Sequence, residues 1–221
     1  MDGWGLGKIK SSDAIQNAKT PFVSSLYSGF PNTTLVTCGE AVGLPEGQMG
    51  NSEVGHLNLG AGRIVYQELQ RINVAIRDGE FRQNKVLLES IRYARENKKP
   101  LHLLGLVSDG GVHSHINHLM AITSLCRAEG LDRVYIHAFT DGRDTDPKSG
   151  LGFLKSLQQH LKSTVGSIAS ITGRYYAMDR DKRWERVKLA YDAMVKGVGK
   201  GTEDVLKVVE DSYREGVTDE F

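Results

Sequence analysis

Three short apolar runs after residue 100 have the character of buried strands. They cover Leu101–Val107, Val134–Phe139 and Ile168–Ile171. Continuous apolar runs of this length, without polar alternation, are typical of parallel strands that are covered on both faces. The pattern therefore predicts a parallel sheet in this part of the chain.

A polar turn and then a stretch with helical periodicity follow each of these runs. The predicted helices are His115–Arg127, Ser149–Leu161 and Asp181–Lys196, with another near Glu203–Tyr213. Strand, polar loop and helix, repeated three times, predict a doubly wound α/β domain. Ligands bind such sheets at the carboxyl ends of the strands. We therefore expect the loops SDGGVHSH, TDGRDTDP and TGRYYAMDR to converge on one site.

The first third of the chain follows a different pattern. A helix over Asp13–Tyr27, a short strand over Thr34–Cys38 and a long glycine-rich loop over Leu44–Gly62 are predicted. After Arg63 the sequence becomes helical and charged, as expected of a hinge between two units. The predicted division is residues 1–65 and 66–221.

Both ends of the sequence are abrupt. The DGWG turn resembles the end of a strand, yet only Met1 precedes it, and GVTDEF ends without a helix cap. We expect a truncated chain.

Composition narrows the class of protein. With 221 residues, 25% of them charged, and a net charge of +1, the chain is an ordinary globular protein without a broad electrostatic surface for nucleic acid or anionic membranes. Cys38 and Cys126 form no CxxC pair, so a reducing compartment is expected. The sequence contains no signal-peptide pattern and no apolar run of transmembrane length. We expect a cytoplasmic protein.

The segment Gly47–Arg63, GQMGNSEVGHLNLGAGR, places Ser52 among glycines, with Asn51, Glu53 and His56 nearby. A serine on such a segment suits nucleophilic attack if a base or a metal ion activates its hydroxyl. For the Asn-Ser pair in isolation, a plain glycine-rich turn is the better interpretation.

The opening DGWG turn offers one carboxylate, Asp2, that suits Mg²⁺ or Mn²⁺. A simple turn explains it equally well. The GLGK that follows is not a phosphate-binding P-loop, because Asp2 stands where a glycine is needed and Ile9 where Ser or Thr is needed.

Three histidines, His113, His115 and His118, follow the first predicted strand. Their spacing is not HExxH and no cysteine is near, so a contact of His113 with substrate is favoured over structural zinc. His115 and His118 fit the start of a helix.

The second loop carries Arg143 and Asp144 between Asp141 and Asp146. Arg143 suits a bidentate grip on a carboxylate or phosphate, and Asp144 suits acceptance of a proton from a sugar-like hydroxyl. An Asx turn and helix cap is the alternative for Asp146.

The third loop is rich in cations. Arg174 and Arg180 are six residues apart on a turn that can fold back onto one anion. Arg183 and Arg186 have helical spacing, which favours a solvated helix face.

Taken in order, the blocks DGWG, GNSEVGH, SDGGVHSH, DGRDTDP, GRYYAMDRDKRWERV and GVTDEF span the whole chain. Together they resemble the cofactor-independent phosphoglycerate mutases, which are alkaline-phosphatase-like metalloenzymes. This resemblance implies interconversion of 3- and 2-phosphoglycerate in glycolysis and gluconeogenesis without bisphosphoglycerate. The enzyme would act as a monomer on small phosphoglycerates, with no nucleic acid or membrane as partner.

The resemblance also implies roles for individual residues. Ser52 would be the nucleophile, carry the phosphoryl group, and bind, together with Asp2, one of two divalent ions. Mn²⁺ is the expected ion, with Mg²⁺ or Co²⁺ as alternatives. The residues implied to bind phosphoglycerate are His113, Arg143, Asp144, Arg174 and Arg180.

By the same resemblance, residues 1–65 are part of a metal-binding phosphatase-like domain, and residues 66–221 form a transferase domain that closes over it. The strand before DGWG, a later arginine-bearing loop and the remaining Asp and His metal ligands have no counterpart in the sequence. We therefore expect the chain by itself to be catalytically inactive.

Two other hypotheses stay open at this point. A phosphatase or sulfatase of the same superfamily would share the Ser52 segment but lack the arginine-rich loops. A non-catalytic binding module would hold acidic metabolites through residues 66–221 alone.

Overall fold

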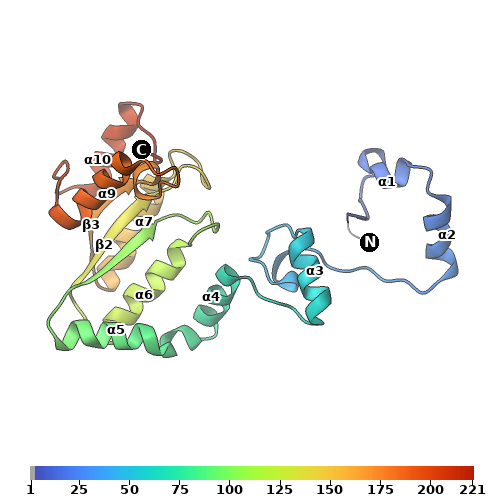
Figure 1. The fold of residues 1–221 in the computed structure, drawn as a ribbon, viewed down its shortest axis with the longest axis horizontal. Helices are drawn as coiled ribbons and strands as arrows, with labels where there is room; N and C mark the ends of the chain where they lie inside the picture. Colours follow the sequence, from blue (N-terminus) through green and yellow to red (C-terminus); the bar gives the residue numbers. More distant parts are fainter. Residues whose placement is uncertain (1–2) are drawn as a thin grey trace. The chain divides into compact units, whose positions relative to one another are not determined.

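A computed structural model describes residues 3–221 (Figure 1). The chain divides into two compact units, the first ending at Gln67 and the second running from Glu68 to Phe221. The division thus falls at 67/68, against the expected 65/66.

The second unit is built on a parallel sheet of three strands in the order β1-β2-β3 (Figure 1). The strands are β1 (Leu101–Leu106), β2 (Val134–Thr140) and β3 (Ser167–Gly173). Leu101 is paired with Val134, and Ile136 with Ile168. The predicted α/β fold and all three predicted strands are confirmed. The central strand, β2, is buried along most of its length. Along the edge strand, β1, partly buried and exposed side chains alternate, and Leu104 is among the exposed ones.

Helices precede and connect these strands. In chain order the second unit contains α4 (Glu68–Arg77), the 3₁₀ helix η3 (Glu80–Gln83), α5 (Lys85–Glu96), α6 (Ile116–Ala128), α7 (Gly150–Ser163), α8 (Arg174–Ala177), α9 (Trp184–Lys196) and α10 (Val205–Arg214). Among residues 3–221, no helix has the length and apolar character needed to cross a membrane.

The predicted helices after the first two strands, and the one near Glu203, begin within two residues of α6, α7 and α10. The helix predicted from Asp181 begins later, at Trp184. Its first residues instead form a turn, because the Asp179 carboxylate accepts the backbone N–H groups of Asp181 and Arg183. This side-chain bonding competes with the helical pattern.

Two apolar clusters form the core of the second unit. In the first, Ile91 of α5 and Cys126 of α6 pack against Val134 of β2. In the second, Leu154 and Leu157 of α7 pack with apolar residues of β2 and α10. Both leucines are fully buried, and each such side chain stabilises the fold by about 1.5–3 kcal/mol.

Burial gives the two cysteines different reactivities. Cys126 is fully buried, and burial raises the pKa of its thiol to about 11, whereas Cys38 is exposed. At pH 8 only about one Cys126 thiol in a thousand is ionised, and thiolate is the reactive form. We expect iodoacetamide to label Cys38 alone in the folded chain and both cysteines in urea, as measured by peptide mass spectrometry. Rapid native labelling of Cys126 would contradict this packing.

The first unit has a small core, formed by Val42, Leu44 and Val54. Phe22 and Leu35 are exposed. Its helices are η1 (Lys10–Ser12), α1 (Ala14–Asn17), α2 (Pro21–Gly29), η2 (Gly39–Val42) and α3 (Ser52–Ala61).

Three predictions for the first unit are wrong in whole or in part. The helix over Asp13–Tyr27 is broken between α1 and α2, because Pro21 has no N–H and disfavours helical geometry at Thr20. No strand forms over Thr34–Cys38. A strand needs a neighbour for its backbone groups, and here the pairing is reduced to one isolated bridge from Cys38 to Met49.

The third correction concerns the glycine-rich segment. Only its first part is a loop, since Ser52–Ala61 forms α3. The Asn51 side chain caps this helix by accepting the N–H of Val54 at 2.9 Å. Asn58 then ties the helix to the loop by donating to the carbonyl of Val42 and accepting from the N–H of Val65. These bonds stabilise the helix in spite of its glycines.

Candidate functional site

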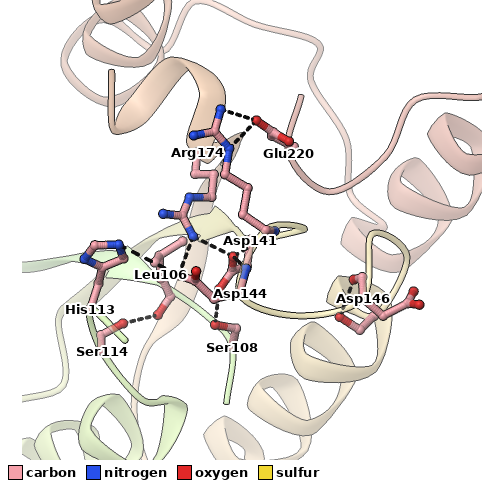
Figure 2. Close-up of polar contacts among 11 residues, drawn as sticks. Leu106, Ser108, His113, Ser114, Asp141, Asp144, Asp146, Arg174 and Glu220 are labelled. Atoms are coloured by element: carbon pink, nitrogen blue, oxygen red, sulfur yellow. Dashed lines mark hydrogen bonds and ion pairs between the residues drawn. The ribbon is translucent and has the colours of Figure 1, made fainter. Parts of the chain in front are cut away.

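The loops that follow the three strands converge at the carboxyl edge of the sheet, as their topology predicts (Figure 2). The loop after β1 contributes Ser108 and His113, the loop after β2 contributes Asp141 and Asp144, and α8, directly after β3, contributes Arg174. Side chains far apart in the sequence therefore form one polar cluster.

Asp141 lies at the centre of this cluster and is only 2% exposed. Its carboxylate accepts the Ser108 hydroxyl at 2.6 Å, the N–H of Arg143 at 3.2 Å and the N–H of Asp144 at 3.0 Å, as well as the Arg174 guanidinium. Burial alone would raise the pKa of Asp141, but the hydrogen bonds from Ser108, the Asp144 amide and Arg174 outweigh it and lower the pKa. Asp141 is therefore a buried anion whose carboxylate accepts four hydrogen bonds.

Arg174, at the start of α8, is 8% exposed. Its Nη1 donates to Asp141 Oδ1 and to Asp144 Oδ2, each at 2.7 Å (Figure 2). Burial would lower the pKa of Arg174, but the bonds to Asp144 and Asp141 raise it. Nε and Nη2 of Arg174 have no partner among residues 3–221. One edge of the guanidinium is thus fixed, and its other donors remain for a ligand.

His113 and Arg143 complete the cluster. His113 Nε2 lies 3.8 Å from Asp144 Oδ2, and the His113 side chain is exposed. Arg143 forms an ion pair with Glu220, at 2.5 Å from both Nε and Nη2 to Oε1. The Asp144 carboxylate thus lies between His113 and Arg174, an arrangement suited to a ligand with both anionic and hydroxyl groups.

Of the five residues predicted to bind substrate, the structure brings together His113, Arg143, Asp144 and Arg174. Arg180 lies in the turn between α8 and α9, is exposed, and forms no ion pair with any residue from 3 to 221. The substrate-binding roles of all five remain predictions.

Sequence reasoning missed three contributors to this site: the central position of Asp141, the Ser108 hydroxyl and Glu220. Asp141 and Ser108 could have been found, because each lies at the end of a predicted strand. No local signal marks Glu220, which is 77 residues from its partner in the sequence.

The neighbouring histidines have structural contacts. The His115 side chain accepts the N–H of Asn117 at the start of α6, and His118 Nε2 lies 2.7 Å from the Asn73 Oδ1 of α4. These contacts fit the prediction that His115 and His118 belong to a helix start. A group of three or more His, Cys, Asp or Glu side chains able to hold a metal ion is not present among residues 3–221.

Ser52 is the first residue of α3 and is exposed. Its hydroxyl lies 3.1 Å from His56 Nδ1, which is also 2.7 Å from the Ser52 carbonyl oxygen. Asp2, the other predicted metal ligand, lies outside the described residues. The described residues therefore do not form a metal site by themselves.

Comparison with known proteins identifies relatives along the whole chain. Residues 72–221 match the family described as the BPG-independent PGAM N-terminus. The chain is 57% identical to the 2,3-bisphosphoglycerate-independent phosphoglycerate mutases of Parabacteroides distasonis and Flavobacterium johnsoniae. Each alignment covers 100% of this chain but 43% and 44% of the relative. The chain therefore spans less than half the length of these relatives.

A solved structure gives the same result at the level of the fold. The phosphoglycerate mutase of Leishmania mexicana, crystallised at low cobalt concentration, is 34% identical, with a TM-score of 0.70. The match covers 100% of this chain and 42% of that chain.

Proposed function

Because the chain belongs to the BPG-independent phosphoglycerate mutase family, we propose that it forms the N-terminal part of an enzyme that interconverts 3- and 2-phosphoglycerate. The enzyme would act as a monomer in the cytoplasm, in glycolysis and gluconeogenesis. The observation that carries the proposal is the cluster in which Arg174 and Arg143 are each fixed along one edge beside Asp144.

The cluster matches the chemistry of phosphoglycerate. A planar guanidinium recognises carboxylate and phosphate through paired N–H groups. Nη1 of Arg143 and Nε and Nη2 of Arg174 have no partner among the described residues, so they are the donors proposed to bind the substrate. Asp144 and His113 would bind the glycerate hydroxyl and hold it while the phosphoryl group is transferred. A phosphatase or sulfatase would not need this retention.

Ser52 is the proposed nucleophile and carrier of the phosphoryl group. It is exposed at the N-terminus of α3, where backbone N–H groups and the helix dipole favour negative charge. A phosphate on Ser52 would be stabilised by that position. The mutase would transfer the group from one hydroxyl of the substrate to Ser52 and return it to the other.

A dependence on divalent metal ions is part of the proposal. The Leishmania structure obtained with cobalt supports it for that relative. We propose two ions, preferentially Mn²⁺, with Asp2 and Ser52 as ligands of one of them. Such ions would stabilise the deprotonated serine hydroxyl. The described residues contain no group of three or more His, Cys, Asp or Glu side chains able to hold a metal ion. The chain by itself is proposed to be catalytically inactive.

Calorimetry with 3-phosphoglycerate tests the binding part of the proposal. We expect the 221-residue chain to bind the ligand through the second unit, with or without Mn²⁺. A coupled assay of the same chain should give no turnover. Absence of binding would reject the proposed function of the cluster.

Replacement of either arginine by lysine should weaken that binding. A lysine retains the charge but cannot reproduce the planar fork, so we expect Arg143→Lys and Arg174→Lys each to raise Kd by about tenfold or more. Arg127→Lys, on the exposed surface of α6, is the control and should leave Kd unchanged. If the Arg143 and Arg174 variants bind like the parent, their role is not anion recognition.

A further inference from the structure

The last residues of the chain cross the loops of the candidate site. After α10, the N–H of Asp219 donates to the carbonyl of Pro147 at 2.9 Å, in the loop after β2. The N–H of Tyr175, in α8, donates to the carbonyl of Glu220 at 2.9 Å, and the Phe221 ring lies 4.9 Å from the Tyr175 ring. The segment therefore joins the loop after β2 to the helix after β3.

The side chain of Asp219 fixes the segment further. It is 3% exposed, accepts the N–H of Gly150 at 2.7 Å and accepts the hydroxyl of Tyr213. Asp219 thus caps the N-terminus of α7, where the orphan N–H groups of a helix favour a carboxylate. The residue before Glu220 is consequently buried, and both its backbone N–H and its carboxylate are bonded.

Glycines allow this close approach. A Cβ atom at Gly142 would lie 2.9 Å from the backbone nitrogen of Glu220, and one at Gly173 would lie 2.4 Å from its carbonyl oxygen. Gly142 also has a φ of +72°, which other residues rarely adopt. The loops leave room for the backbone of Glu220 and for little else.

Glu220 thereby presents its carboxylate to Arg143 from a fixed backbone. Oε1 lies 2.5 Å from Nε and from Nη2 of Arg143, and the Glu220 side chain is 19% exposed. Nη1 of Arg143 has no partner among residues 3–221. The ion pair orders a long side chain along one edge and leaves the other edge available.

We propose that Glu220 is a positioning residue, whose carboxylate orients Arg143 so that its Nη1 edge receives a carboxylate or phosphate oxygen of the substrate. The inference rests on the proposed function in one respect, that Arg143 binds an anion. Because Arg143 is ordered before the ligand arrives, less rotamer entropy is lost on binding. A second effect opposes this one, since Glu220 is itself negative and repels an anionic ligand.

These two effects make opposite predictions for Glu220→Ala. If positioning dominates, loss of the side chain weakens anion binding; if repulsion dominates, it strengthens binding. Glu220→Gln removes the charge but retains Oε1 as an acceptor, so it should preserve the orientation. Glu215→Ala, at the exposed end of α10, also removes one carboxylate, but Arg143 forms its ion pair with Glu220 and not with Glu215, so this variant serves as the control.

The experiment uses the 221-residue chain and two measurements. Calorimetry gives Kd for 3-phosphoglycerate, and peptide mass spectrometry follows the rate at which phenylglyoxal modifies Arg143. We expect Glu220→Ala to raise Kd about tenfold and to speed modification several-fold. Glu220→Gln should keep Kd within about threefold of the parent, and Glu215→Ala should match the parent in both measurements.

An unchanged or lower Kd for Glu220→Ala would overturn the inference. If the parent chain binds no 3-phosphoglycerate, the proposed function fails, and the modification rate still decides the positioning of Arg143. In that case an unchanged rate in Glu220→Ala overturns the inference. Urea unfolding of each variant identifies any loss of binding that is caused by unfolding. If Glu220→Ala is destabilised, Glu220→Gln provides the comparison.

Discussion

Replacing Asp141 by alanine is expected to lower the free energy of unfolding of the second unit by about 3–5 kcal/mol. The carboxylate is 2% exposed and receives four donors, which come from the loops after β1 and β2 and from α8. Its removal leaves Arg174 buried with Asp144 as its one remaining carboxylate, and it leaves the Ser108 hydroxyl without an acceptor. Removing the partner of a buried charge lowers the free energy of unfolding far more than removing the partner of an exposed charge.

Urea unfolding followed by circular dichroism measures this change. Asp132→Ala is the matched control, because Asp132 is also paired with an arginine but is 79% exposed and 3.9 Å from Arg127. Exposed pairs of this kind contribute about 0–1 kcal/mol. A loss below about 1 kcal/mol for Asp141→Ala would show that Asp141 does not stabilise the cluster.

The pH dependence of stability is a second test of whether the ionised Asp141 stabilises the second unit. A carboxyl whose folded pKa is lowered contributes stability above its ordinary pKa of 3.8, and that stability is lost as the pH falls through the folded value. As the pH decreases below 3.8, the free energy of unfolding of Asp141→Asn should therefore fall less steeply than that of the parent chain. Equal acid sensitivity of the two proteins would argue against an ionised Asp141.

The second unit could be predicted from the sequence because its signals are local. The apolar runs of the strands are bounded by polar turns, and burial of both faces of β2 needs a continuous apolar run. Convergence of Asp144 and Arg174 followed from topology alone, since parallel strands bring their carboxyl ends to one edge. The identity of these side chains predicts an anionic ligand.

The first unit could not be predicted equally well, because its elements depend on single capping contacts. The glycines of Leu44–Gly62 predict a loop, but one side chain, Asn51, is enough to begin α3. For Thr34–Cys38 the sequence has the composition of a strand without a partner to pair with. Strand propensity measures a fit to neighbouring strands rather than an intrinsic preference of the backbone.

The ion-pair partners at the site were equally inaccessible to sequence reasoning. The sequence predicts that Arg143 and Arg174 bind anions, but nothing in their sequence neighbourhood indicates Glu220. Their apparent surplus of positive charge is in fact matched by Asp141, Asp144 and Glu220. The structure therefore changes the interpretation of the cluster from a set of free cations to a set of oriented ones.

Replacing Ser52 by alanine is expected to abolish mutase turnover in a protein with the full length of the relatives. Loss of a nucleophile that works as a unit with its activating groups lowers kcat by up to about 10⁶-fold. The variant should also acquire no phosphoryl group when incubated with 3-phosphoglycerate, as measured by peptide mass spectrometry. Ser90→Ala, an exposed helical serine of α5, is the control and should retain both turnover and phosphorylation of Ser52.

Because of the geometry of α3, this substitution should remove the Ser52 hydroxyl without disturbing the fold. The helix is capped by the Asn51 side chain, through its bond to the N–H of Val54, and not by Ser52. Alanine is well tolerated in the first turn of a helix, so the variant should fold like the parent. Turnover within about tenfold of the parent, or a phosphorylated peptide from the Ser52→Ala protein, would place the nucleophile elsewhere. Loss of turnover in a protein with an unchanged circular dichroism spectrum would instead assign the loss to the missing hydroxyl.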